Sequence, residues 1–116
     1  MTKKIDGILL IEDEVDLAEV LCFIFEDLGI KIEVALSAEE AKKKLEECSY
    51  KLVISDMRLP DGSGAEICKT YHQKCPFILY SGFSDLSKQE ALDMGAMIIL
   101  SKPLDLEGLG SLIKTF

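Results

Sequence analysis

Short apolar runs alternate with longer amphipathic segments along the whole chain. The apolar runs lie within residues 7–11, 31–35, 51–55, 76–79 and 96–100. The segments between them repeat apolar residues at the spacing of helices, over about residues 14–28, 37–48, 65–71, 84–95 and 105–115. Strands that alternate with helices over short connections predict an α/β fold, in which helices cover both faces of a parallel sheet.

Capping residues support several of these helix ends. Gly29 follows the first helical segment, where a C-terminal cap is usual. Ser37 precedes the second segment and Glu40 follows three residues later, which is the spacing of a capping box. The last segment is the weakest helix, because Gly108 and Gly110 lower its intrinsic helix propensity.

Two of the runs indicate where their strands lie in the sheet. Residues 31–35 alternate apolar and charged side chains, which is typical of an edge strand. Residues 51–55 are mostly apolar, as expected for a strand that is covered on both faces. Right-handed crossovers then favour a three-layer (βα)5 flavodoxin-like sandwich with strand order 2-1-3-4-5. We find no internal repeat or linker, and we expect residues 1–116 to form a single domain.

Composition narrows the class of partner. The chain is 48% hydrophobic and 29% charged, as soluble globular proteins are. Its net charge of −8 argues against direct binding to nucleic acid or to an anionic membrane. The apolar runs are much shorter than the roughly 20 residues that span a bilayer. The N-terminus has no signal-peptide pattern, so we expect a cytoplasmic protein.

The cysteines do not indicate a metal centre. They lie at positions 22, 48, 68 and 75, without a Cys-x-x-Cys pair, and His72 is the only histidine. A zinc site needs closer ligand spacing than this. Cys22 and Cys68 occupy apolar helix positions, so we expect buried free thiols rather than disulfides.

Polar residues with complementary chemistry end four of the apolar runs. They are Glu12-Asp13, Asp56, Ser81-Gly82 and Lys102-Pro103. The carboxyl ends of parallel strands meet at one edge of a sheet, where open α/β sheets bind their ligands. We therefore expect three acids, a hydroxyl and an ammonium to gather in one crevice.

This set of groups is suited to phosphoryl transfer. Asp13 and Asp56 can supply carboxylates to Mg²⁺, with Glu12 binding directly or through water. Asp56 can also act as a nucleophile, since carboxylates form aspartyl-phosphates. Lys102 and Ser81 would then disperse the charge of the phosphoryl oxygens.

Each piece has a simpler interpretation when it is taken alone. The acids after residue 11 are common at helix N-termini, and Asp56 is a frequent turn residue. Ser81-Gly82 is an ordinary turn and Lys102-Pro103 an ordinary strand exit. The functional interpretation rests on all four pieces ending parallel strands in complementary roles.

Together these residues resemble the receiver domain of two-component response regulators. The resemblance covers nearly the whole chain and includes residues 56–64, Asp-Met-Arg-Leu-Pro-Asp-Gly-Ser-Gly. It implies that Asp56 accepts a phosphoryl group from a histidine kinase or a histidine phosphotransfer protein. It implies a Mg²⁺ ion held by Glu12, Asp13, Asp56 and the backbone carbonyl of Arg58. The domain would regulate an output partner and would turn over no external substrate.

The resemblance also assigns roles at the other strand ends. Ser81 stands at the switch hydroxyl position, Lys102 would bind the phosphoryl group, and the Lys102–Pro103 peptide is expected to be cis. The output face would be formed by the fourth helix, the fifth strand and the last helix, and a homodimer through this face stays open. Ile99 departs from the pattern, because the family usually has Tyr or Phe there. Coupling through Ile99 packing or through Phe83 is our hypothesis.

Two rival functions remain. A pseudo-receiver would keep the fold as a protein-binding module without phosphorylation. The departure at Ile99 favours it, but the intact acids, hydroxyl and lysine count against it. A Mg²⁺-dependent phosphohydrolase would use Asp56 as its nucleophile, but no general acid or substrate cap is evident. A flavin site is weaker still, since no loop rich in Ser, Thr and Gly follows the first strand.

Overall fold

The structure, a computed structural model of the chain, describes residues 3–82 and 88–115. Its main sheet has five parallel strands in the order β2-β1-β3-β6-β7. These strands are β1 (Lys3–Ile11), β2 (Ile32–Ala35), β3 (Cys48–Asp56), β6 (Phe77–Ser81) and β7 (Ile98–Ser101). The predicted flavodoxin-like sandwich and its strand order are confirmed, with the polar second strand at an edge.

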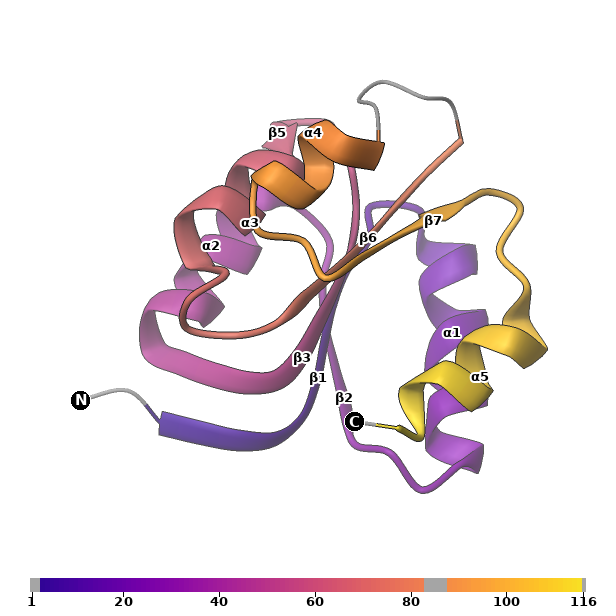
Figure 1. Cartoon of the computed structure of the whole chain (residues 1–116). Coiled ribbons are helices and arrows are strands. Elements are labelled where there is room, and N and C mark those ends of the chain that lie inside the picture. The colour runs from indigo at the N-terminus through magenta and orange to yellow at the C-terminus, as the bar shows by residue number, and fades with distance from the viewer. Residues whose placement is uncertain (1–2, 83–87, 116) are drawn as a thin grey trace.

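Helices form a layer on each face of this sheet (Figure 1). One layer contains α1 (Val15–Asp27) and α5 (Leu106–Ile113). The other contains α2 (Ala38–Glu47), α3 (Gly64–Tyr71) and α4 (Lys88–Asp93). The expected start of the fourth helix, near residue 84 or 87, lies outside the described residues.

Two apolar clusters fill the spaces between the sheet and its helices. Leu9, Ile11 and Val53 face α2 and α3, whereas their strand neighbours Leu10 and Ile54 face α1 and α5. This alternation buries both faces of the central strands β1 and β3. Each fully buried Leu or Ile contributes about 1.5–3 kcal/mol relative to an exposed one.

The ends of α1 and α2 follow the sequence expectation closely. After α1, Gly29 has φ +78°, and the N–H groups of Gly29 and Ile30 bond the carbonyls of Glu26 and Phe25. This is the pattern of a Schellman motif. Before α2, the Ser37 hydroxyl accepts the Glu40 N–H at 3.1 Å. The Glu40 carboxylate reaches back to the Leu36 N–H at 3.3 Å, one residue before its usual capping-box partner.

The strands β1 and β3 are longer than the apolar pattern predicted. Lys3, Lys4 and Ile5 pair with Cys48, Ser49 and Tyr50, and the register shifts between Ile5 and Ile8. Ile5, Cys48 and Tyr50 of this extension pack against the cluster that faces α2 and α3, whereas Lys3 and Lys4 are exposed. Helical spacing predicts Cys48 on the inner stripe of the second helix together with Ala41 and Leu45. This prediction is wrong, because Cys48 opens β3 directly after α2.

Helical spacing over residues 14–28 predicts one apolar stripe, formed by Val15, Ala18, Leu21, Cys22, Phe25 and Leu28. The buried stripe of α1 is narrower than this. Ala18, Leu21 and Phe25 are buried, but Val15 is 50% exposed. Phe23, outside the predicted stripe, is 74% exposed. All four cysteines are free thiols, as predicted. Cys68 is buried, whereas Cys22 is only half-buried.

The turn-rich segment after β3 forms a small antiparallel hairpin. Its strands are β4 (Arg58–Leu59) and β5 (Gly62–Ser63). At its tip, the Asp61 carboxylate accepts the N–H groups of Ala38 and Glu39, at 2.8 and 3.0 Å. The hairpin therefore caps the first turn of α2 from outside that helix.

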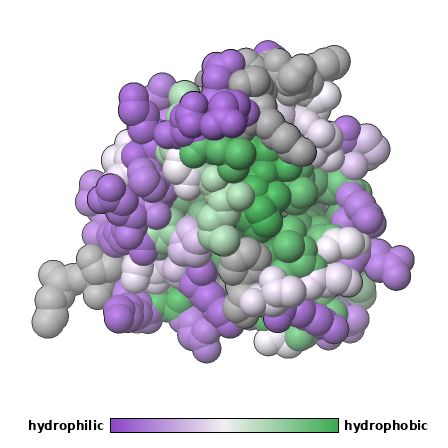
Figure 2. All heavy atoms as spheres, in the orientation of Figure 1, coloured by the Kyte–Doolittle hydropathy of each residue, from purple (hydrophilic) through white to green (hydrophobic). Residues whose placement is uncertain are grey.

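Apolar side chains also gather on one exposed face. Figure 2 shows them over the edge strand β7, between α4 and α5. Leu92 of α4 and Met97, directly before β7, are exposed, and residues 98–100 are half-buried. This face corresponds to the output face that the family resemblance implies.

Replacing Asp61 by Ala should lower the stability of the fold at neutral pH. The two N–H bonds hold the pKa of Asp61 below its usual range. Its contribution should therefore be present above the unfolded pKa, about 3.9, and fade as pH falls through the lower folded value. Urea unfolding measured from pH 7 to pH 3 gives the free energy of unfolding of wild type and of Asp61→Ala. The difference between the two should shrink as the pH falls. A gap of constant size would contradict this role, and Glu47→Ala, at the far end of α2, serves as control.

Replacing Gly64 by Ala should destabilise the end of β3. A β-carbon at Gly64 would collide with the Asp56 carbonyl oxygen and the Ser55 hydroxyl. The neighbouring atoms are backbone or buried, so we expect a loss of about 1–3 kcal/mol in the free energy of unfolding. At Gly82 the nearest atom, Lys102 Cδ, is 3.8 Å away, so Gly82→Ala is the matched control. Equal stabilities of the two variants in chemical denaturation would refute the expected collision.

Candidate functional site

Strand register brings the predicted site residues to one end of the sheet. Asp56 ends β3 opposite Tyr80, and Ser81 ends β6 opposite Ser101. Glu12 and Asp13 follow β1 directly, and Lys102 follows β7 directly. The four strand ends therefore lie side by side, as the sequence predicted.

Three carboxylates form a cluster at this end. Glu12, Asp13 and Asp56 each offer an oxygen within 4.8 Å of the other two. Glu12 is 1% exposed and Asp56 is 7% exposed, whereas Asp13 is open to solvent. Buried carboxylates at this separation repel one another, so the cluster needs compensating donors or cations.

Asp56 is held by two such donors. Its Oδ2 accepts a hydrogen bond from Lys102 Nζ at 2.7 Å, within an ion pair. Its Oδ1 accepts the backbone N–H of Arg58 at 3.0 Å. Burial by itself lowers the pKa of Lys102, but the hydrogen bond and charge of Asp56 outweigh burial and raise that pKa. The ammonium therefore stays charged beside Asp56.

Glu12 is also fixed through both of its oxygens. Oε1 accepts the Tyr80 hydroxyl at 2.7 Å, and Oε2 accepts the Glu14 N–H at 3.0 Å. Burial raises the pKa of Glu12, and these two hydrogen bonds oppose that rise. Burial is likewise the largest cause of the raised pKa of Tyr80.

Sequence reasoning did not identify Tyr80 as part of the site. Tyr80 lies between the apolar run of residues 76–79 and the candidate residue Ser81, and nothing in that pattern distinguishes it. One signal was available, because a tyrosine in a buried strand needs a partner for its hydroxyl. Glu12, which follows β1 two strands away in the sheet, is that partner.

The donor set fits a hard divalent cation. All three clustered residues offer carboxylate oxygens, which Mg²⁺ prefers over nitrogen or sulfur. Their summed charge exceeds that of the Lys102 ammonium, so a net negative charge remains to attract a cation. Glu12, Asp13 and Asp56 are the residues that would hold the ion.

The other predicted residues have mixed outcomes. Ser81 lies beside Lys102, and its carbonyl accepts the Lys102 N–H at 2.9 Å. The Lys102–Pro103 peptide is cis, as the resemblance implied. Ile99 is half-buried against the cluster that faces α2 and α3. The metal-ligand role of the Arg58 carbonyl stays a prediction, and Phe83 lies outside the described residues.

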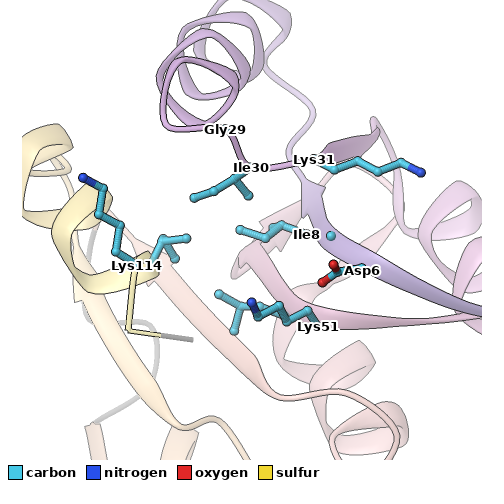
Figure 3. Close-up of a pocket in the computed structure, with 10 residues that line it drawn as sticks. Asp6, Ile8, Gly29, Ile30, Lys31, Lys51 and Lys114 are labelled. Atoms are coloured by element: carbon cyan, nitrogen blue, oxygen red, sulfur yellow. The ribbon is translucent and has the colours of Figure 1, made fainter.

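A separate cavity of about 280 Å³ lies at the opposite, amino ends of the strands (Figure 3). Its apolar part includes Ile8 and Ile30, and Lys51 and Lys114 lie at its edge with Asp6. It is far from the acidic cluster in the fold, so it is not part of the candidate site.

No helix among the described residues has the length and apolar character that crossing a membrane requires.

Comparison with protein families gives a match to the response regulator receiver domain over residues 8–114. That range includes every candidate site residue.

Two curated relatives illustrate the match. The response regulator PilR of Pseudomonas aeruginosa is 32% identical over 111 residues, which cover 92% of this chain and 25% of PilR. The aerobic respiration control sensor ArcB of Escherichia coli is 30% identical, over 95% of this chain and 15% of ArcB. The chain thus spans a quarter or less of the length of these two relatives.

Solved structures show the same architecture. A two-component response regulator from Clostridium difficile superposes with a TM-score of 0.88 at 32% identity, covering 96% of this chain and 94% of that one. The response regulator TrrA of Thermotoga maritima, in complex with Mg²⁺ and BeF, gives 0.84 at 27% identity over 96% and 98%. With the matching fold, acidic cluster and lysine in place, the chain belongs to the response regulator receiver domain family.

Proposed function

We propose that this chain is the phosphoacceptor domain of a two-component phosphorelay, with Asp56 as the phosphorylated residue. The arrangement that carries the proposal is the Asp56 carboxylate, which lies between the acidic cluster and the Lys102 ammonium. Receiver domains are phosphorylated by histidine kinases and regulate output domains. They are regulatory modules and generally not enzymes.

The proposed reaction is a displacement at phosphorus. A carboxylate oxygen of Asp56 attacks the phosphorus of a phosphohistidine, and the P–N bond breaks. The electron pair of that bond stays on the imidazole nitrogen, which takes a proton from solvent. Lys102 would turn from the Asp56 carboxylate to a phosphoryl oxygen, and the Ser81 hydroxyl would donate to another.

Mg²⁺ is the cofactor in this proposal. Glu12, Asp13, Asp56 and the backbone carbonyl of Arg58 would hold it. When bound, it would neutralise charge on the phosphoryl group as that group approaches the acids. The Mg²⁺ in the TrrA complex supports this assignment by analogy.

The remaining expectations concern context. A histidine kinase or a phosphotransfer protein would be the donor, and a cytoplasmic location follows from such a partner. Residues 1–116 would act as a single receiver domain.

The apolar face over β7 is our candidate for the output interface. Exposed Leu92 and Met97 flank the half-buried residues 98–100 on this short edge strand. An output partner, or a second copy of this chain, would cover this face and exclude water from it. Ile99 would couple the face to the site through its packing.

Two rival functions predict different chemistry. A pseudo-receiver would bind its partner without phosphorylation, and a phosphohydrolase would release phosphate from an external substrate. The hydrogen-bonded Asp56–Lys102 pair favours the phosphoacceptor over the first rival. Neither rival accounts for the match to receiver domains together with the complete acidic cluster.

Intact mass after incubation with acetyl phosphate and Mg²⁺ tests the proposal. Wild type should gain one phosphoryl group only with Mg²⁺ present, and Asp56→Ala should gain none. Asp61→Asn, an acid of the same segment, should be phosphorylated normally. Lack of an adduct in wild type that still binds Mg²⁺ would point to fast hydrolysis, which a beryllofluoride complex would test. Lack of both adduct and Mg²⁺ binding would refute the proposal in favour of the pseudo-receiver.

Coupling through Ile99 has its own test. Beryllofluoride with Mg²⁺ should shift the NMR signals of β7 and α4 in wild type, and Ile99→Ala should reduce those shifts. Ile98→Ala is the matched control, because Ile98 faces the opposite cluster. If the NMR signals of β7 and α4 stay unchanged in wild type with the phosphoryl analogue bound, the coupling hypothesis is wrong.

A further inference from the structure

Tyr80 contacts both kinds of charge that flank Asp56. It is fully buried in β6, and its hydroxyl donates to Glu12 Oε1 at 2.7 Å. Its ring lies under the Lys102 ammonium, with Nζ 5.4 Å from the ring centroid. In the sheet register Tyr80 stands directly opposite Asp56. The backbone pairing that positions the phosphoacceptor therefore also positions this ring.

The tyrosine is not explained by packing alone. The cluster around it is largely aliphatic and includes Ile54 and Ile78, so Leu or Phe would fill the same space. The hydroxyl adds a polar group that must find a partner in the core. Its partner is itself a buried acid, so each group satisfies the other.

The hydroxyl removes the freedom of Glu12 to turn away from the cluster. Both carboxylate oxygens are engaged, by Tyr80 on one side and by the Glu14 N–H on the other. Repulsion from Asp56 and Asp13 would otherwise favour rotation of Glu12 out of the site. A ligand that is already oriented loses less entropy when it binds an ion.

The ring acts on the cation in a similar way. The face of an aromatic ring attracts an ammonium group at this distance. Lys102 is therefore held by the ring as well as by the carboxylate of Asp56. When the ion pair breaks during phosphorylation, the ring still keeps Lys102 near the phosphoryl group.

We propose that Tyr80 is a positioning residue for phosphoryl transfer. Its hydroxyl orients Glu12 toward Mg²⁺, and its ring orients Lys102 toward the phosphoryl oxygens. The inference rests on the proposed function of the site, and it assigns the two effects to separate parts of one side chain.

Two variants separate these effects. Tyr80→Phe removes the hydroxyl and keeps the ring, so the Kd for Mg²⁺ should rise roughly ten-fold. Its initial rate of phosphorylation by acetyl phosphate should recover at saturating Mg²⁺. Tyr80→Leu removes both, and its rate should stay roughly three-fold low even at saturating Mg²⁺. Calorimetric titration measures the affinity, and intact mass measures the rate.

Tyr50 offers a matched control. It is also buried, and its hydroxyl donates to Glu33 Oε1 at 3.1 Å, away from the site. Tyr50→Phe should alter stability without changing either Mg²⁺ affinity or the rate. Mg²⁺ affinity in Tyr80→Phe equal to that in wild type would overturn the inference, since the hydroxyl would then be a core hydrogen bond only.

A measurement on wild type tests the same inference even if a Tyr80 variant fails to fold. Titration with Mg²⁺ should shift the ring signals of Tyr80 in NMR and leave those of Tyr50 in place. Mg²⁺ binding with no change at Tyr80 would again overturn the inference. Failure of wild type to bind Mg²⁺ and to form an adduct would instead refute the proposed function, so the two failures are distinguishable.

Discussion

Repulsion among carboxylates is the constraint around which this end of the molecule is organised. Parallel strands bring Glu12, Asp13 and Asp56 within a few ångströms, and two of the three acids are buried. The carboxylates of Glu12 and Asp56 accept hydrogen bonds that offset this repulsion, and the donors are Lys102, Tyr80 and the backbone N–H groups of Arg58 and Glu14. Such a site holds its acids ready for a cation because those donors, and the surrounding sheet, keep the acids from moving apart.

The same contacts explain how a stable domain can contain a switch. The two apolar clusters on either face of the sheet hold β1 and β3 firmly, while the reactive groups sit just past the ends of those strands. Lys102 forms an ion pair with the Asp56 carboxylate. Phosphorylation of that carboxylate would break this ion pair. Chemistry at the strand ends can therefore rearrange side chains without costing the core its packing.

Much of this arrangement could be predicted from the sequence. The apolar runs predicted the strands. The polar residues that follow those runs, among them Glu12, Asp56 and Lys102, were the predicted site residues. Local periodicity could not predict contacts between distant segments, such as the Tyr80 hydroxyl on Glu12 or the Asp61 carboxylate on α2. It also missed the extensions of β1 and β3, where isolated apolar residues such as Ile5 and Tyr50 lie among polar ones. Val15 has helical spacing with the buried residues of α1 and is nevertheless exposed. Periodicity alone does not predict how much of a helix surface the sheet will cover.

Asp61 gives the region beside the phosphoacceptor an unexpected kind of cooperativity. Since its carboxylate binds the first N–H groups of α2, the β4–β5 hairpin and the start of that helix share one set of hydrogen bonds. Neither can open to solvent without exposing polar groups of the other. Local unfolding here should then be a joint event, and the Ala38 and Glu39 amides should exchange their protons at the rate at which the hairpin lifts away. The β4–β5 hairpin, which follows Asp56 closely in the chain, thus controls local opening at the start of α2.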